Sequence, residues 1–161
     1  MKIISRNIGR IHAKDPENIL IQDYKKRIDS IGKSAGIIGF DILEYEIKKN
    51  LPAEALKDEE ATLLLKDTSS QDVIIALDER GKNISTIDFT NILESAQSNN
   101  IKRCFFLIGG AHGLSANVRK SANHVISFGK MTVPHKIARI LLTEQIYRAM
   151  TIIQKHPYHK I

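Results

Sequence analysis

The chain has 161 residues, of which 42% are hydrophobic and 26% charged, and its formal net charge is +6 at pH 7. This length and composition predict one soluble globular domain with a substantial core. The sequence has no run of about 18 apolar residues, which excludes a membrane span, and scattered charges near its start argue against a signal peptide. The only cysteine, Cys104, excludes an internal disulfide. We therefore expect a cytoplasmic protein in which this thiol is buried and inert.

The charge is distributed unevenly along the chain. Residues 1–100 hold 14 Lys and Arg against 17 Asp and Glu. Residues 101–161 hold 10 Lys and Arg against the single acid Glu144, together with five of the six histidines. A basic C-terminal third indicates a polyanionic partner, and nucleic acid is the simplest one.

Apolar runs typical of strands alternate with helical patterns along the chain. Strands are expected over residues 1–8, 40–47, 72–78, 104–110 and 124–129. Helices are expected over residues 16–33, 52–67, 85–98, 115–123 and 134–155. Ser85 and Asp88 have the spacing of a capping box, and Ser115 is placed to cap the short fourth helix.

This alternation, with β-branched residues in the apolar runs, predicts an α/β fold with a mostly parallel sheet flanked by helices. No repeat, low-complexity segment or linker interrupts the pattern, so residues 1–161 are expected to form a single domain. Ligands of such sheets bind beyond the carboxyl ends of the strands. The site is therefore expected near Leu77–Asp78, Ile108–Gly113 and Phe128–Pro134.

A glycine-rich stretch, LIGGAHGLS (107–115), follows one expected strand and precedes the helix capped by Ser115. Glycine allows a backbone to approach a ligand closely. The stretch lacks the G-x-x-x-x-G-K-S/T spacing of a P-loop, and Ile108 stands where a dinucleotide-binding G-x-G-x-x-G pattern would need glycine. From these residues alone, a ligand-binding turn and a tight turn without a ligand are both open.

The last expected helix is apolar on two sides. One stripe comprises Ala138, Leu141, Leu142, Ala149, Ile152 and Ile153, and the other comprises Ile137, Ile140 and Tyr147. A helix of this kind can pack on the sheet with one side and on a partner with the other. We therefore expect a homodimer.

The chain ends in HPYHKI (156–161). His156 and His159 have an H-x-x-H spacing, but without a nearby acid or cysteine this is a poor zinc pattern, and no metal site is expected. The sequence also lacks the G-x-S-x-G elbow of a Ser-His-Asp hydrolase.

Three stretches in the C-terminal part carry a resemblance to a known family. They are LIGGAHGL, then ISFGKMTVPHKIARILLTEQIYRA, then the terminal HPYHK, and their order and spacing match over residues 103–160. The earlier stretch VIIALDERGK (73–82) matches as well. The sequence thus resembles the RlmH family, small bacterial methyltransferases of the SPOUT class that modify a pseudouridine in 23S ribosomal RNA.

The resemblance implies a fold, a cofactor and a partner. SPOUT enzymes have an α/β fold whose C-terminal part threads through a loop to make a trefoil knot, which is a rare kind of connection. They bind S-adenosylmethionine in the knotted loops and act as homodimers with each site at the interface. The RlmH family methylates N3 of pseudouridine and prefers assembled ribosomes to free RNA.

The resemblance also implies roles for individual residues. The implied cofactor-binding residues are Leu77, Gly109, Gly110, Phe128, Gly129, Lys130, Met131, Thr132 and Val133. The implied catalytic residues are Arg148, Tyr158 and His159, and the implied RNA-binding residues are Arg148 and Lys160. Lys160 stands where arginine is common in the family, so it keeps the charge for a phosphate but lacks the planar guanidinium.

The proposed reaction requires that the weakly acidic N3–H lose its proton. His159 could act as the base, or Arg148 could stabilise the imide anion, and the residues do not decide whether a dedicated base exists. Tyr158 could stack on the RNA base or hydrogen-bond it. Two structural alternatives are open, because Arg148 can pair with Glu144 at i, i+4 spacing and Tyr158 can dock the tail onto the core.

Two other classes of function compete with an RNA methyltransferase. A non-catalytic basic RNA-binding module would bind RNA with a steep salt dependence and would ignore S-adenosylmethionine. A small-molecule α/β enzyme would use the glycine-rich stretch to hold a phosphate. The missing P-loop lysine and dinucleotide-binding pattern argue against this second class.

Overall fold

The computed structural model describes residues 1–158 of the chain. Its strands are β1 (Lys2–Ile8), β2 (Gly39–Tyr45), β3 (Val73–Asn83), β4 (Arg103–Ile108) and β5 (His124–Ser127). Its helices are α1 (Pro16–Ile31), α2 (Ala53–Leu64), α3 (Thr86–Ser98), α4 (Ala116–Ser121) and α5 (His135–Ile153), with a 3-10 turn, η1 (Lys33–Ala35), after α1. The expected strands and helices are confirmed to within a few residues at their ends, except at the end of β3.

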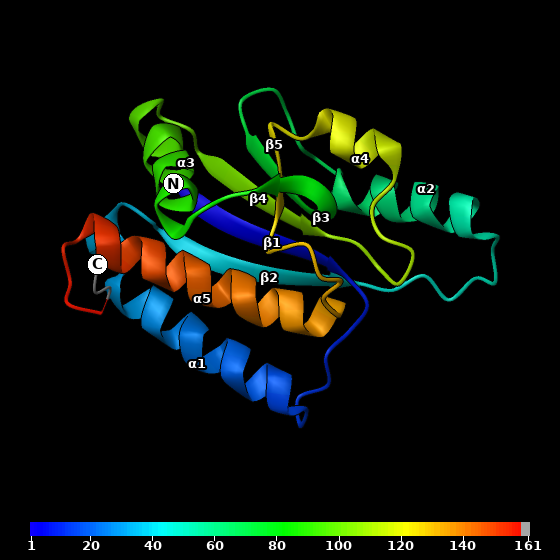
Figure 1. Ribbon diagram of the computed structural model, residues 1–161, viewed down its shortest axis with the longest axis horizontal. Helices are drawn as coiled ribbons and strands as arrows, with labels where there is room; N and C mark the ends of the chain where they lie inside the picture. Colours follow the sequence, from blue (N-terminus) through cyan, green and yellow to red (C-terminus); the bar gives the residue numbers. More distant parts are fainter. Residues whose placement is uncertain (159–161) are drawn as a thin grey trace.

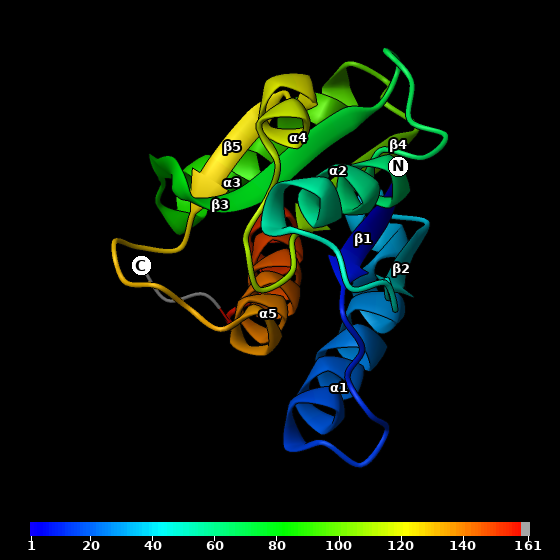
Figure 2. The same ribbon diagram turned by 90° about the vertical axis from the view of Figure 1, so that its right-hand side faces the viewer.

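The five strands form one sheet in the order β2-β1-β4-β3-β5, and each neighbouring pair is parallel. Helices α1, α3 and α5 cover one face of the sheet, and α2 and α4 cover the other (Figures 1 and 2). The carboxyl ends of β1, β2 and β4 point to the right in Figure 1. The arrangement confirms the predicted α/β fold with a parallel sheet flanked by helices.

Alternate residues of each strand enter two separate cores. Ile3 and Phe106 belong to the cluster on the α1, α3 and α5 side, whereas Ile4 and Phe105 belong to the cluster on the α2 and α4 side. Because both faces are covered, residues 73–77 of β3 and 104–108 of β4 are apolar on both sides and form continuous apolar runs. Cys104 lies in the first cluster, where burial raises its pKa to about 12, so the expected buried and inert thiol is confirmed.

Two predicted helix caps are present. The Asp88 amide donates to Ser85 Oγ at 3.1 Å, and the Ser85 amide donates to the Asp88 carboxylate at 3.0 Å, which is a complete capping box. The Val118 amide donates to Ser115 Oγ at 3.2 Å. Ser115 therefore fixes the start of α4 directly after the glycine-rich stretch.

Strand β3 differs most from its prediction. The sequence predicts its end at Asp78, whereas the strand continues to Asn83 and pairs with β5 in a shifted register. Gly81 permits this path, since a Cβ there would lie 2.5 Å from the carbonyl carbon of Ile126. The extension is polar, and its pairing is set by the neighbouring strand, so periodicity in the sequence does not reveal it.

Helix α5 lies between α1 and α3 (Figure 1). Leu142, Ile146 and Ala149 are buried against the sheet. Leu141 belongs to the same predicted stripe as Leu142 but is 37% exposed, and Ile137 of the other stripe is 41% exposed. The homodimer stays a prediction, as does the trefoil knot. Within residues 1–158, no helix is long and apolar enough to cross a membrane.

Candidate active site

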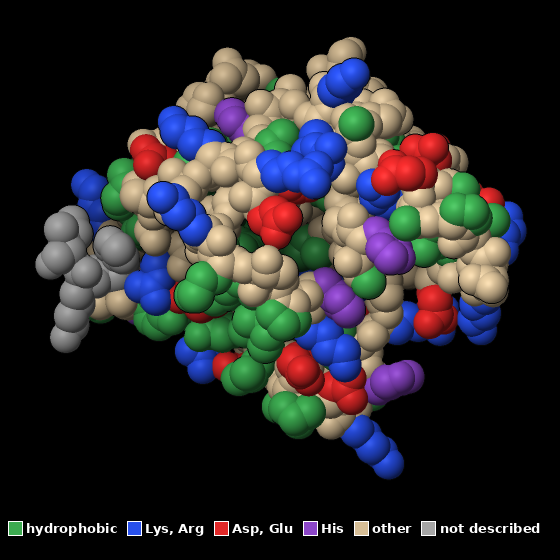
Figure 3. Space-filling model, turned by 45° about the vertical axis from the view of Figure 1, so that its right-hand side comes forward, with side chains coloured by type: hydrophobic (Ala, Val, Ile, Leu, Met, Phe, Trp, Pro, Cys, Tyr) green, Lys and Arg blue, Asp and Glu red, His purple; other side chains and the backbone are tan. Residues whose placement is uncertain are grey.

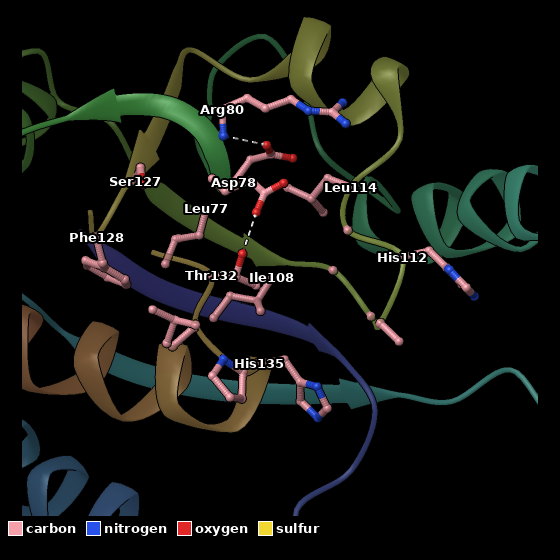
Figure 4. Close-up of a pocket in the computed structure, with 18 of the residues that line it drawn as sticks. Leu77, Asp78, Arg80, Ile108, His112, Leu114, Ser127, Phe128, Thr132 and His135 are labelled. Atoms are coloured by element: carbon pink, nitrogen blue, oxygen red, sulfur yellow. Dashed lines mark hydrogen bonds between the residues drawn. The ribbon is translucent and has the colours of Figure 1, made fainter. Parts of the chain in front are cut away.

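A cavity of about 540 Å³ opens at the carboxyl ends of β4 and β5 and beside residues 77–80 of β3, where that strand shifts register (Figure 4). The predicted cofactor-binding residues that line it are Leu77, Gly109, Gly110, Phe128, Gly129, Met131, Thr132 and Val133. Lys130 is exposed and is not among the lining residues. Three segments that are far apart in the sequence thus meet in one cavity, at the strand ends where a ligand was expected.

Residues 109–113, called the glycine turn below, form one wall of the cavity. The Gly113 amide donates to the Gly110 carbonyl oxygen at 3.1 Å and closes the turn. A Cβ at Gly109 would lie 2.8 Å from the Gly113 carbonyl carbon, and Gly113 itself has a φ of +72°. A Cβ at Gly110 would lie 2.8 Å from a carboxylate oxygen of Glu60. Close packing behind the turn therefore requires glycine. Because glycine has no side chain, the backbone of the turn is accessible from the cavity.

Arg119 ties the glycine turn to β3. One guanidinium nitrogen donates to the Leu114 carbonyl oxygen and lies 3.4 Å from an Asp78 carboxylate oxygen. The other Asp78 oxygen accepts the Arg80 amide at 3.0 Å (Figure 4). Only 7% of the Asp78 side chain is exposed. These contacts fix two walls of the cavity relative to each other.

The segment after β5, residues 128–134, forms another wall. The Gly129 amide donates to Ser127 Oγ at 3.2 Å, and Gly129 has a φ of +141°, so the chain turns sharply here. Thr132 Oγ1 donates to a Glu79 carboxylate oxygen at 3.2 Å, which links this segment to β3 (Figure 4). Met131 is 83% exposed. The wall is thus joined to β3 through an exposed hydrogen bond, which can open more readily than a buried one.

The lining combines apolar surface with charge. Leu77, Ile108 and Phe128 supply apolar side chains (Figure 4). The basic lining residues are Lys57, Arg80 and Arg119, and the acidic ones are Asp78 and Glu79. Figure 3 shows the hollow with Lys and Arg side chains around it and a carboxylate at its edge. A mostly apolar interior with a few polar groups is typical of cofactor sites.

His135, the first residue of α5, also lines the cavity (Figure 4). Burial, together with the charges of Arg139 and Lys136, lowers the pKa of His135, so the imidazole is neutral at pH 7. Arg139 is buried and donates to the carbonyl oxygens of Ile8 and Gly9 at 2.6 and 2.9 Å. The start of α5 is therefore held against the end of β1.

Arg148 and Tyr158 form a separate group with other residues of α5. Arg148 Nε donates to Glu144 Oε1 at 2.9 Å, so the i, i+4 ion pair considered for Arg148 is present. The Tyr158 ring lies 4.8 Å from the Tyr147 ring, and its hydroxyl donates to Glu144 at 3.3 Å. Burial raises the pKa of Tyr158 to about 12. Tyr158 is thus docked on the core of its own chain.

The cavity is lined by the first turn of α5, whereas this group lies near the other end of the helix. Arg148 is thirteen residues beyond His135 on the helix, which corresponds to about 20 Å at 1.5 Å per residue. Neither Arg148 nor Tyr158 lines the cavity. His159 and Lys160 lie outside the described residues. The residues implied as catalytic and those implied as cofactor-binding are therefore not brought together within residues 1–158 of a single chain.

Some lining residues were not singled out from the sequence. Glu79 and Arg80 follow the point where β3 was expected to end, so they were not considered. Lys57 and Arg119 come from α2 and α4, and the expectation that ligands bind at the carboxyl ends of strands does not point to helices. The only sequence signal for Arg119 was that it is a basic residue in the first turns of the helix that Ser115 is placed to cap. Within residues 1–158, no group of three or more His, Cys, Asp and Glu side chains could hold a metal ion.

Comparison with known proteins gives the same family throughout. A family model described as "Predicted SPOUT methyltransferase" matches residues 1–159. The chain is 39% identical to a protein of Nitrobacter hamburgensis named ribosomal RNA large subunit methyltransferase H, over 99% of each chain. It is 41% identical to the protein of the same name from Ruegeria sp. (strain TM1040), over 96% of each chain.

A solved structure supports the fold independently. It is a "probable methylase family protein" from Haemophilus influenzae Rd KW20, with a TM-score of 0.53 at 10% sequence identity. The match covers 99% of this chain and 70% of that one. The chain therefore belongs to the SPOUT methyltransferase family, among the ribosomal RNA large subunit methyltransferase H proteins.

Proposed function

We propose that the protein transfers a methyl group from S-adenosylmethionine to N3 of a pseudouridine in 23S ribosomal RNA. In this proposal it acts as a homodimer on assembled ribosomes in the cytoplasm. The proposal is supported by the family and by the names of its relatives. The observation that carries it is the cavity at the carboxyl ends of β4 and β5 and beside residues 77–80 of β3, with the glycine turn as one wall.

The lining residues fit S-adenosylmethionine. The cavity volume of about 540 Å³ is within the range of roughly 300–1,000 Å³ that is usual for small-molecule sites. Leu77, Ile108 and Phe128 would hold the adenine, and the bare backbone of the glycine turn would approach the cofactor closely. Asp78 and Glu79 would offset its positive charges. When bound, this cofactor supplies an electrophilic methyl group on a sulfonium.

The remaining tasks fall to the side chains of the protein. The chain must hold the target base in line with the methyl group and stabilise the imide anion formed when N3–H loses its proton. Arg148 would stabilise this anion, His159 would accept the proton, and Tyr158 would stack on the base. Lys57, Arg80 and Arg119 at the cavity, with Lys160 in the tail, would contact phosphates.

The distance along α5 between Arg148 and the cavity determines how the two could act together. Ala138 is the last residue of α5 that lines the cavity, and Arg148 lies ten residues beyond it, about 15 Å along the helix axis, too far for a direct contact. In the proposed homodimer, the end of α5 and the tail of one copy cover the cavity of the other. Met131 lines the cavity, and Ile137 and Leu141 lie in the first two turns of α5; all three are exposed apolar side chains that would be buried between the copies.

The test is transfer of a labelled methyl group from S-adenosylmethionine to ribosomes that lack this methylation. The expected product, after digestion of the RNA and mass spectrometry, is one N3-methylpseudouridine per large subunit. Gly109→Ala, which puts a methyl group into the packed turn, serves as the control with weakened cofactor binding, and its transfer should be reduced when S-adenosylmethionine is limiting. Tight and salt-sensitive ribosome binding without any transfer would replace the proposal with the non-catalytic RNA-binding module.

A further inference from the structure

Tyr24 and Arg27 of α1 lie beside the aromatic group near the end of α5. The Tyr24 and Tyr147 ring centroids are 6.0 Å apart, and those of Tyr147 and Tyr158 are 4.8 Å apart. Helices α1 and α5 pack along each other (Figure 1), and the i, i+3 spacing of Tyr24 and Arg27 puts both on the same face of α1. The three rings thus form one row that begins on α1 and ends on the tail.

Two guanidinium groups lie over this row of rings. The Arg27 guanidinium carbon lies 5.4 Å from the Tyr24 ring centroid and 5.9 Å from that of Tyr147. The Arg148 guanidinium carbon lies 5.0 Å from the Tyr158 ring centroid. An arginine within about 6 Å of a ring centroid is attracted by the face of the ring. Arg27 therefore belongs to the same cluster as Arg148 and Tyr158, which are proposed to act on the RNA base.

The two arginines differ in how exposed their acidic partners are. Arg148 pairs with Glu144, whose side chain is only 14% exposed and also accepts a hydrogen bond from the Tyr158 hydroxyl. Arg27 pairs with Asp23 at 2.7 Å, and these two side chains are 46% and 51% exposed. An exposed i, i+4 pair contributes little to stability, because water and salt screen it. A phosphate can therefore replace Asp23 on Arg27 at little cost, while the ring contacts keep the guanidinium in place.

We propose that Arg27 binds a phosphate of the ribosomal RNA next to the nucleotide that is methylated. The inference rests on the proposed function, because it places the target base at Arg148 and Tyr158. A guanidinium suits this task, since its planar fork of N–H donors matches two phosphate oxygens. In the proposed homodimer, Arg27 accompanies the end of α5 and the tail to the cavity of the other copy. RNA binding thereby includes α1, which lies in the part of the chain without an excess of basic residues.

The test compares Arg27→Gln and Arg27→Lys with the control Lys25→Gln. Lys25 is a matched control, because it forms an i, i+4 ion pair with Asp29 on the same helix at 2.7 Å. It is two residues from Arg27 and so lies on a different side of α1. We measure the dissociation constant for ribosomes that lack this methylation at several salt concentrations, and kcat and KM for methyl transfer. The melting temperature and oligomeric state of each protein are measured alongside.

We expect Arg27→Gln to bind ribosomes about five-fold more weakly and to reduce the slope of log affinity against log salt by about one, as the loss of one phosphate contact does. The KM for ribosomes should rise by a similar factor, with kcat within about two-fold of the wild type. Arg27→Lys keeps the charge, so its salt slope should match the wild type. Lys25→Gln should bind ribosomes as the wild type does.

A wild-type salt slope in Arg27→Gln would overturn the inference, and with a lowered melting temperature it would leave Arg27 with a packing role alone. Equal changes in Arg27→Gln and Lys25→Gln would also overturn it, because the effect would then belong to overall charge. So would a monomeric Arg27→Gln protein, since Arg27 would then contact the second copy. A wild-type protein that binds ribosomes without methyl transfer would instead contradict the proposed function.

Discussion

Single glycines shape the proposed cofactor site. Gly109 and Gly113 pack backbone against backbone, and a Cβ at Gly109 would lie 2.8 and 2.9 Å from the carbonyl carbon and oxygen of Gly113. Backbone atoms cannot move aside as the end of a flexible side chain can. The turn must therefore shift when Gly109 is replaced, and the cavity wall shifts with it.

Gly109→Ala is accordingly expected to weaken the binding of S-adenosylmethionine at least ten-fold, or roughly 1.4 kcal/mol, while the protein stays folded. Gly39→Ala is the matched control, since nothing lies within 4 Å of a Cβ at that position. Titration calorimetry and circular dichroism measure the two effects. Equal cofactor affinity in Gly109→Ala and Gly39→Ala would show that the glycine turn does not form the cofactor wall.

At the scale of secondary-structure elements, α5 connects the cavity proposed for the cofactor with the side chains proposed for catalysis. Its first residue, His135, lines the cavity, and its last turns carry Arg148 and Tyr147, on which Tyr158 is docked. The structural alternatives considered for Arg148 and for Tyr158 are both present, as the Arg148–Glu144 ion pair and the contact between the Tyr158 and Tyr147 rings. These contacts do not prevent a role in catalysis for the same side chains.

A chain that ends at Lys155 tests the two roles of the tail together. It loses the Tyr158 contact with Tyr147, so we expect a loss of about 1 kcal/mol in stability, or roughly 2–4 °C in melting temperature. We also expect methyl transfer to fall at least 100-fold at temperatures where both forms are folded. Normal transfer by the shortened chain would leave the tail with a structural role alone.

The sequence predicts the elements of this protein better than their mutual positions. Strands and helices follow from apolar periodicity and from caps such as Ser85 and Ser115, and the cavity follows from the strand-end rule for parallel sheets. Lys57 and Arg119 could not be predicted as lining residues, because their places depend on how α2 and α4 pack beside the glycine turn. The length of α5 separates the tail from the cavity, and a one-dimensional pattern match does not show this distance.

At the scale of the whole molecule, stability is expected to depend on the protonation of His135. Burial lowers the pKa of His135 below the ordinary value of 6.5, so the unfolded chain binds its proton more readily than the folded one. The contribution of the neutral His135 side chain to the free energy of unfolding is complete above pH 6.5. It is lost as the pH falls through the lowered pKa of His135. The protein should therefore be less stable at pH 5.5 than at pH 7.5.

Urea unfolding at these two pH values measures the effect, with His135→Gln as the comparison. The variant lacks the titrating imidazole, so its loss of stability between pH 7.5 and 5.5 should be smaller than that of the wild type. His12, an exposed histidine, supplies the control His12→Gln, which should keep the wild-type loss. An identical loss in all three proteins would assign the pH dependence to other groups.

The central claim concerns the dimer, since the cavity of one copy is proposed to act together with Arg148 of the other. The most direct measurement mixes two impaired variants, Gly109→Ala and Arg148→Ala, after joint unfolding and refolding. Labelled methyl transfer to ribosomes is followed at an S-adenosylmethionine concentration that fills the intact cavity and leaves the Gly109→Ala cavity empty. Random pairing gives mixed dimers with one intact cavity facing one intact Arg148, so we predict recovery of about a quarter of wild-type activity. No recovery, with mixed dimers demonstrated by native mass spectrometry, would contradict a site shared between two copies.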